Sequence, residues 1–289
     1  MTAVSGQKKS KQELFASVPV KEALFTMAVP TIISQVINLI YNMVDAFFIG
    51  RTGNSYMMAA TSICLTMVSI DSQNRRAVFT VGVPSAVLTG LFDAANICVN
   101  ILAAGHNDLV LAAMGIVMKV ERVPNAVNIG ICQGMLPIVA FNYASGNESR
   151  MKETIRTARF AGLSISLLCI VLFELFADPV SRLFLSTSAS DAAAALTTVS
   201  FAALFLRIRC IASPLQLLNY HTSYCLQAMG KGKQTLLHAF VRELVFYIPL
   251  MFILDGLFQE VGLAAALPVG EGLAAVFALY LLHRTIRRV

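Results

Sequence analysis

The side chains of Asn42 and Asp45 stand three residues apart in the apolar stretch 24–49, near the start of this sequence. Side chains at that spacing lie on one face of a helix. A carboxylate beside an amide can hold a proton or a sodium ion, and a carboxylic acid removed from water keeps its proton more tightly. The pair is therefore a candidate cation site. Alternatively, Asp45 lies close enough to Gly50, at the end of the stretch, to be simply hydrated.

A second group of polar residues lies in the apolar stretch 78–103. Asp93, Asn96 and Asn100 fall at positions i, i+3 and i+7, so they share one side of a helix that is otherwise apolar. Such a stripe lines a cavity or makes hydrogen bonds to a neighbouring helix, and the sequence leaves both interpretations open.

Ionisable groups also occur in later apolar stretches. Lys119, Glu121 and Arg122 nearly cancel in charge, which favours a structural salt bridge. Glu271 stands alone in the stretch 261–283 and needs a partner, because an unpaired charge at membrane depth is costly. It is a further acidic candidate.

Two pairs of charges lie elsewhere in the apolar stretches. Arg207 and Arg209 need partners within the membrane. Arg242 and Glu243 lie near one end of the stretch 235–254, so we expect their side chains to extend toward water.

The sequence carries no signature of catalysis or of a bound cofactor. None of the four histidines belongs to a His-Glu-x-x-His motif, and the six cysteines include no Cys-x-x-Cys pair. The stretch QAMGKGKQT lacks the spacing of a phosphate-binding loop, so direct use of ATP is not expected. We expect no enzyme, no metal site and no cofactor.

Composition places these polar residues in a membrane. Hydrophobic residues make up 57% of the sequence and charged residues 13%, and the mean hydropathy is +0.71. A spanning helix needs about 20 apolar residues. The sequence therefore predicts an all-α, polytopic membrane protein with about eight transmembrane helices. The predicted spans are 24–49, 55–70, 78–103, 109–143, 157–177, 193–228, 235–254 and 261–283.

The basic residues predict the orientation. With eight spans both termini lie on one side, and that side collects most of the Lys and Arg residues in the loops. By the positive-inside rule both termini are cytoplasmic, in a multi-pass protein of the cell (plasma) membrane. Basic cytoplasmic loops also explain the net charge of +6, so we expect no binding of nucleic acid.

Two of the apolar stretches look like copies of one element. Each begins with Val-Pro and carries an Asn at the same distance from its proline, in the pairs Pro30/Asn42 and Pro84/Asn96. Internal repeats with polar groups inside apolar helices are typical of transporters built from two related halves. The copies are too close together for each to represent a whole half.

These landmarks resemble the multidrug and toxic compound extrusion (MATE) family, whose members are cation-coupled antiporters with twelve helices in two six-helix lobes. The first stretch resembles the opening helix of that family. The start of the family's seventh helix is resembled by the segment RRAVFTVGVPSAVLTGLFDAANICVN. The turns after the eighth and tenth helices resemble QGMLPIVAFNYASGN and CLQAMGKGK. The last two helices resemble RELVFYIPLMFIL and GLAAALPVGEGLAAVFALYLL. The resemblance covers nearly the whole chain.

The chain departs from the family pattern in one region. The chain has no counterpart of family helices three to six, and the join lies near Ile70 to Arg76. Residues 1–72 would then form a truncated N-terminal lobe, and residues 73–289 a complete C-terminal six-helix lobe. With much of one lobe absent, transport by a single copy is in question.

The resemblance implies a membrane antiporter that exports drugs or toxic organic cations in exchange for protons or sodium ions. Its partners would be the lipid bilayer and small organic cations, and a homodimer could rebuild a two-lobed cavity. The residues proposed for cation coupling and transport are Asp45, Asn42, Asp93, Asn96, Asn100 and Glu271. The alternatives are a non-transporting remnant or partner subunit, and a lipid-linked flippase of the same superfamily with a wider, basic cavity.

Overall fold

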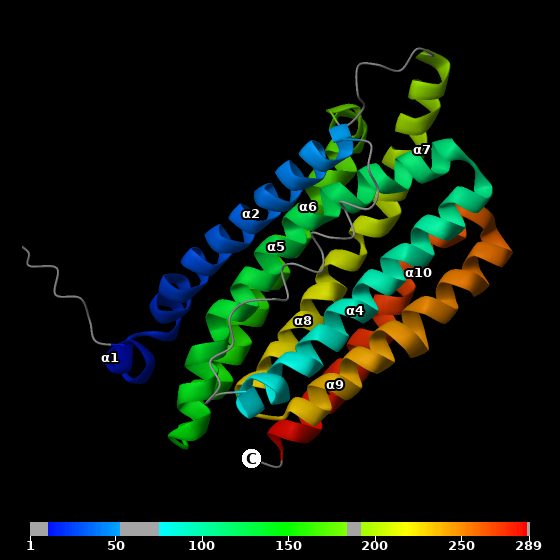
Figure 1. Cartoon of the computed structure of the whole chain (residues 1–289). Coiled ribbons are helices and arrows are strands. Elements are labelled where there is room, and N and C mark those ends of the chain that lie inside the picture. Colours follow the sequence, from blue (N-terminus) through cyan, green and yellow to red (C-terminus); the bar gives the residue numbers. More distant parts are fainter. Residues whose placement is uncertain (1–10, 53–74, 184–191, 288–289) are drawn as a thin grey trace, which may run out of the picture.

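The chain folds as a bundle of long helices (Figure 1). A computed structural model describes residues 11–52, 75–183 and 192–287, and within these ranges every regular element is a helix. The prediction of an all-α protein is confirmed. The helices are α1 (Lys11–Ala16), α2 (Val20–Thr52), α4 (Arg75–His106), α5 (Asp108–Ala144), α6 (Glu148–Leu183), α7 (Ala192–Cys210), α8 (Ala212–Ala228), α9 (Gly232–Phe240), the π-helix η2 (Val241–Tyr247) and α10 (Ile248–Ile286).

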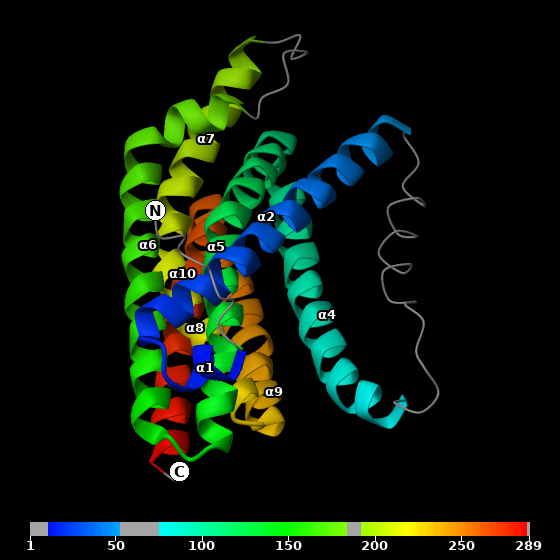
Figure 2. The same ribbon diagram turned by 90° about the vertical axis from the view of Figure 1, so that its left-hand side faces the viewer.

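Helix α5 is the centre of the bundle, because it packs against α2, α4, α6, α7 and α8. Figure 2 shows α2 crossing the bundle obliquely, with its C-terminal end pointing away from it. Helix α4 lies on another side of the bundle, against α5, α9, η2 and α10.

Five helical stretches in the described part of the chain are long and apolar enough to cross a membrane. They are Val20–Tyr41, Asp108–Ala144, Glu148–Arg182, Ala193–Cys210 and Gly232–Ile286. This bears out a polytopic membrane protein, whereas the number of eight spans stays a prediction. The predicted span 55–70 lies outside the described residues. The division into lobes at residue 72 also stays a prediction.

The last two predicted spans form a helical hairpin that turns at Gln259. This residue has φ 54° and ψ −140°, a conformation that residues with a side chain rarely adopt, and it interrupts α10. Just after it, Gly262 packs so closely on the Leu254 carbonyl that any added Cβ would collide with that oxygen. Figure 1 shows the chain reversing direction there. The reversal brings the final helical segment back alongside η2 and α8.

Two glycines on α5 allow α2 to approach very closely, and we call this contact the α2–α5 crossing. A Cβ on Gly130 would lie 2.7 Å from the Cα of Ile32, and one on Gly134 would lie 2.5 Å from the Cα of Ala28. The pair has the Gly-x-x-x-Gly spacing that lets membrane helices pack backbone against backbone. Thr31 spans the contact by donating a hydrogen bond from Oγ1 to the Gly130 carbonyl at 2.7 Å.

The segment that leads into α2 is fixed by Arg150, in the first turn of α6. Its Nε donates to the Phe15 carbonyl at 2.7 Å, and its Nη2 donates to the carbonyls of Leu14 and Val18. These carbonyls belong to the end of α1 and the turn after it, where helical partners are lacking. Asn142 adds a hydrogen bond from Nδ2 to the Phe15 carbonyl at 3.2 Å. The guanidinium thus holds the N-terminal segment against α5 and α6.

The buried apolar side chains form two clusters along the bundle. One surrounds Met135 and Leu226, close to the α2–α5 crossing. The other surrounds Met114, Phe205 and Met251, close to the hairpin turn. The polar side chains described next adjoin this second cluster.

Candidate functional site

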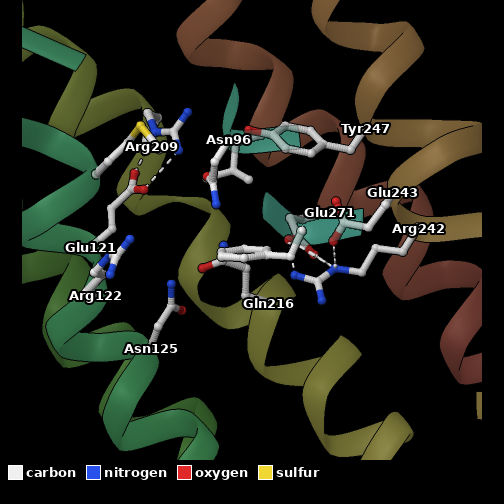
Figure 3. Close-up of a pocket in the computed structure, with 13 residues that line it drawn as sticks. Asn96, Glu121, Arg122, Asn125, Arg209, Gln216, Arg242, Glu243, Tyr247 and Glu271 are labelled. Atoms are coloured by element: carbon white, nitrogen blue, oxygen red, sulfur yellow. Dashed lines mark hydrogen bonds and ion pairs between the residues drawn. The ribbon is translucent and has the colours of Figure 1, made fainter. Parts of the chain in front are cut away.

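A pocket rich in charged side chains lies among α4, α5, α7, α8, η2 and α10 (Figure 3). It holds about 490 Å³ of space free of protein atoms, including the part that opens outward. We call it the charged pocket. Its lining residues are Phe92, Asn96, Met118, Glu121, Arg122, Asn125, Arg209, Gln216, Arg242, Glu243, Tyr247, Leu267 and Glu271. Three of them are arginines and three are glutamates, so the formal charge of the lining is balanced.

One wall of the pocket carries an ion pair between α5 and α7. Arg209 donates from Nε to Glu121 Oε1 at 2.7 Å and from Nη2 to Glu121 Oε2 at 2.9 Å. The two side chains are only 4% and 13% exposed. Figure 3 shows the Tyr247 hydroxyl pointing toward this pair from the opposite side. A two-pronged pair of this kind neutralises both groups and fixes their geometry.

The opposite wall carries a second ion pair, between η2 and α10. Arg242 donates from Nη2 to Glu271 Oε1 at 2.5 Å and from Nε to Oε2 at 3.1 Å. Its guanidinium also lies over the Tyr220 ring, 4.8 Å from the centroid. Glu243 lies farther away, with Oε1 3.6 Å from Arg242 Nε. Arg242 therefore pairs chiefly with Glu271.

Glu271 is also held by a chain of hydrogen bonds that runs away from the pocket. Asn219 donates from Nδ2 to Glu271 Oε2 at 2.6 Å and to the Glu271 carbonyl at 3.1 Å. Since a carbonyl oxygen only accepts, the Asn219 amide orientation is fixed and its Oδ1 faces His238 Nε2 at 3.1 Å. His238 must therefore carry a hydrogen on Nε2, and its Nδ1 lies 3.0 Å from Ser223 Oγ.

The structure brings some of the predicted site residues together and separates others. Asn96 and Glu271 both line the pocket, and Glu271 is 4% exposed. Asp93 and Asn100, on the same helix as Asn96, are exposed and are not among the lining residues. Asn42 and Asp45 lie in the second half of α2, where the structure describes the helix but not their side chains. Their role stays a prediction.

One expectation about the other charged residues was wrong, and another was met with a partner from a different helix. Arg242 and Glu243 do not extend to water but are only 12% and 7% exposed, because the π-helix η2 turns them into the bundle beside Glu271. The salt bridge expected at Glu121 does form, with Arg209 of α7 rather than with a neighbour along α5. Arg207 finds its partners at Asp178 and Glu174 on α6, at 2.9 and 4.0 Å.

Several residues of the site were not predicted as such from the sequence. His238 and Arg242 are four residues apart, so they share one helix face, and both are directed at Glu271 or its partner. Asn219 and Gln216 lie on α8. A balanced count of acids and bases in different apolar stretches was the available signal, since each buried charge needs a partner of opposite sign.

Comparison with known proteins identifies the family. The MatE family model matches residues 84–253, more than half of the chain and most of the pocket. The chain belongs to the MATE family. Members of this family are membrane transporters rather than enzymes.

Curated relatives of this MATE protein include multidrug exporters. The multidrug export protein MepA of Staphylococcus saprophyticus is 27% identical over 209 residues, which cover 71% of this chain and 44% of the relative. MepA of Staphylococcus aureus is 23% identical over 231 residues, which cover 79% of this chain and 49% of the relative. The chain thus spans about half the length of the relatives that it matches.

Solved structures show the same fold. The MATE transporter VcmN of Vibrio cholerae, in its bent form, matches with a TM-score of 0.67 at 18% identity, covering 77% of this chain and 49% of that chain. A MOP superfamily transporter from Pyrococcus furiosus matches with a TM-score of 0.68 at 19% identity, covering 76% and 48%. At these identities the likeness shows a MATE-type fold.

Proposed function

We propose that this MATE protein exports drugs or toxic organic cations in exchange for protons or sodium ions, and that the charged pocket lies on the path of the exported molecule. The observation that carries the proposal is the pocket itself, where six helical elements direct polar side chains into one space inside an apolar bundle. Charged groups at membrane depth are costly, and in membrane proteins they mark the paths of substrates and ions.

Cation coupling is proposed to involve the residues predicted from the sequence. Asp45, with Asn42, would take up a proton or sodium ion in one orientation of the protein, and release of the cargo would follow movement of the first membrane helix. The packing of α2 supports a role for this helix in ion uptake and movement. Its first half is fixed at the α2–α5 crossing, whereas Ile37, Ile40 and Val44 in its second half are exposed. Asp93, Asn96, Asn100 and Glu271 are the remaining candidates.

The test is efflux of a fluorescent organic cation from vesicles that contain the chain, with and without a proton or sodium gradient. We expect gradient-dependent efflux, and we expect Asp45→Asn to abolish it without loss of protein in the membrane. The matched control is Glu153→Gln, which removes an acid from the exposed side of α6, outside the pocket. Unchanged efflux in Asp45→Asn would contradict the coupling role. Lack of efflux in the unaltered chain under both gradients would contradict the proposed function.

A second candidate function is that of a partner subunit, which includes the homodimer considered above. It is favoured by the length of the match, about half of each relative. Native mass spectrometry of the detergent-purified protein tests it, with a dimer as the expected result and a monomer that transports alone as the contrary one. The balanced charge of the pocket does not favour a lipid-linked flippase, for which a wider, basic cavity would be expected.

In keeping with the fold, we also propose that both termini are cytoplasmic and that the protein resides in the cell membrane. The basic residues of the loops support this orientation. Labelling by a membrane-impermeant reagent tests it, with a single cysteine placed at residue 13 or at residue 284, both exposed, in a chain whose six native cysteines are replaced. We expect no labelling in intact cells and labelling after the cells are opened.

A further inference from the structure

Three charged side chains are exposed on the surface of the bundle without a partner of opposite sign. Asp93 on α4, and Lys119 and Arg122 on α5, make no ion pair or hydrogen bond with any residue that the structure describes. All three belong to stretches predicted to span the membrane, 78–103 and 109–143. A charge at membrane depth is costly unless it is paired or hydrated, so lipid tails are unsuitable neighbours for this part of the surface.

The three charges lie at nearly the same depth. Helices α4 and α5 meet at Asn107 and pack against each other, so they run in opposite directions from that turn. Asp93 is 14 residues before Asn107, and Lys119 and Arg122 are 12 and 15 residues after it. At the rise of an α-helix these separations correspond to about 21, 18 and 23 Å. The hydrocarbon core of a membrane is about 30 Å thick, so all three fall within it, with Asp93 between the two basic residues in depth.

The exposed charges border the charged pocket. Asp93 precedes Asn96 by three residues and Lys119 precedes Arg122 by three, so each is a neighbour on the same helix face. Asn96 and Arg122 line the pocket. A body seated on Asp93 and Lys119 would therefore lie against the pocket as well.

We propose that this face of α4 and α5 binds a second copy of the chain, with Asp93 of each copy placed between Lys119 and Arg122 of the other. The inference deepens the second candidate function above, on which it rests, by naming the partner and the interface. Two copies inserted the same way in a membrane pair symmetrically about an axis along the membrane normal. Groups at equal depth then meet across that axis, and these three charges are at equal depth.

Charge complementarity is what selects a second copy as the occupant. Lys119 and Arg122 are one turn apart on α5, and a carboxylate at a depth between theirs accepts hydrogen bonds from both. The symmetric pair forms this contact twice, and every exposed charge of the face gains a counter-charge away from lipid. The same arrangement sets the two charged pockets against each other, so each is covered by the other copy.

The test is whether these charges control self-association. Energy transfer between donor-labelled and acceptor-labelled copies in lipid vesicles, followed as the membrane is diluted with lipid, measures dimerisation and requires no transport. We expect the unaltered chain to dimerise. Asp93→Lys makes all three positions positive, and Lys119→Glu/Arg122→Glu makes all three negative. Each variant alone should dimerise about a hundredfold more weakly, because like charges then meet across the axis.

Mixing the two variants gives the decisive result. A copy with three positive charges and a copy with three negative charges should form a heterodimer at least as tight as the unaltered dimer. The matched control is Glu153→Lys, which makes the same change of charge on the exposed side of α6 and should leave dimerisation unchanged. Where a reversed charge lowers the yield of folded protein, Asp93→Asn keeps the size of the side chain and should also weaken the dimer.

The outcomes separate this inference from the proposed transport function. A monomeric unaltered chain would overturn the inference even where gradient-driven efflux is observed. A dimer that survives both charge changes would overturn it too, because the copies would then meet through another face. Dimerisation that is lost in each variant and restored in their mixture would uphold it, even where the vesicles show no efflux.

Discussion

Helix α5 takes part in two regions that are held together in opposite ways. At the α2–α5 crossing, Gly130 and Gly134 bring two backbones into contact, and the interface leaves no room even for a methyl group. At the charged pocket, Glu121 and Arg122 stand beside open space, and an ion pair joins the helices within each wall. Along the helix, Glu121 and Gly130 are about 13 Å apart, given the rise per residue. The first region does not tolerate added side-chain volume, and the second does not tolerate the loss of one charged side chain.

The largest effect is expected from removing one half of a buried ion pair in the pocket. Glu121→Leu leaves the Arg209 guanidinium, which is 4% exposed, without a counter-charge. We expect a loss of about 3–5 kcal/mol in the free energy of unfolding. The measurement is unfolding in dodecyl sulfate, followed by the reaction of a thiol dye with buried cysteines such as Cys132 and Cys225.

The double variant Glu121→Leu/Arg209→Met serves as the control for this prediction. It removes both charges, so most of the lost stability should return. A double variant as unstable as Glu121→Leu would show that packing at these positions, rather than the unpaired charge, decides the outcome.

The next effect is expected from adding volume at the α2–α5 crossing. In Gly134→Ala the new methyl group would meet the Ala28 backbone, which cannot move without shifting α2. We expect the free energy of unfolding to fall by about 3 kcal/mol, the upper end of the usual cost of overpacking. The same unfolding measurement applies. Gly115→Ala on the same helix meets nothing within 4 Å and should be neutral or stabilise by about 0.5–1 kcal/mol.

The two regions also differ in how far the sequence predicts them. The long apolar stretches predict most of the helices well, because burial in a membrane demands length and hydrophobicity and little else. The stretches 235–254 and 261–283, for instance, correspond to the two arms of the hairpin that turns at Gln259. The resemblance to the MATE family also led to the correct fold.

The pocket was predicted only in part, because its geometry depends on contacts between distant segments. Asn96 and Glu271 stand out in the sequence because they are polar in apolar surroundings. Arg242 was misplaced, because a regular α-helical register does not reveal the π-helix that turns it inward. The partner of Glu121 could not be read from its neighbours along α5, because Arg209 belongs to another helix.

A smaller effect is expected at Arg150. Like the pocket residues it is charged, but it binds backbone carbonyls rather than a carboxylate. Arg150→Gln removes the donors to the carbonyls of Leu14, Phe15 and Val18, which can then turn to water. We expect the free energy of unfolding of this N-terminal segment to fall by about 1.5 kcal/mol, the lower end of the contribution of hydrogen bonds to charged groups. Protease digestion tests it, with faster cleavage near α1 and unchanged cleavage at the turn around Gly230. Arg150→Lys should restore only part of the protection, because an ammonium cannot reproduce the planar fork of donors. Identical digestion of Arg150→Gln and the unaltered chain would show that α1 is held by its apolar contacts alone.

The smallest effect is expected where a charge pair lies on the surface. Lys152 Nζ lies 2.6 Å from Glu148 Oε2, one turn apart on α6, but the two side chains are 49% and 46% exposed. Lys152→Gln should therefore cost only about 0.3–0.5 kcal/mol, and less at high salt, because water screens the exposed pair. The distance is as short as that between Glu121 and Arg209, so the two substitutions separate the effect of burial from that of geometry. A loss in Lys152→Gln as large as that in Glu121→Leu would mean that short distance alone sets the strength of an ion pair here. Removal from water would then not explain why an ion pair in the charged pocket contributes more to stability than one on the surface.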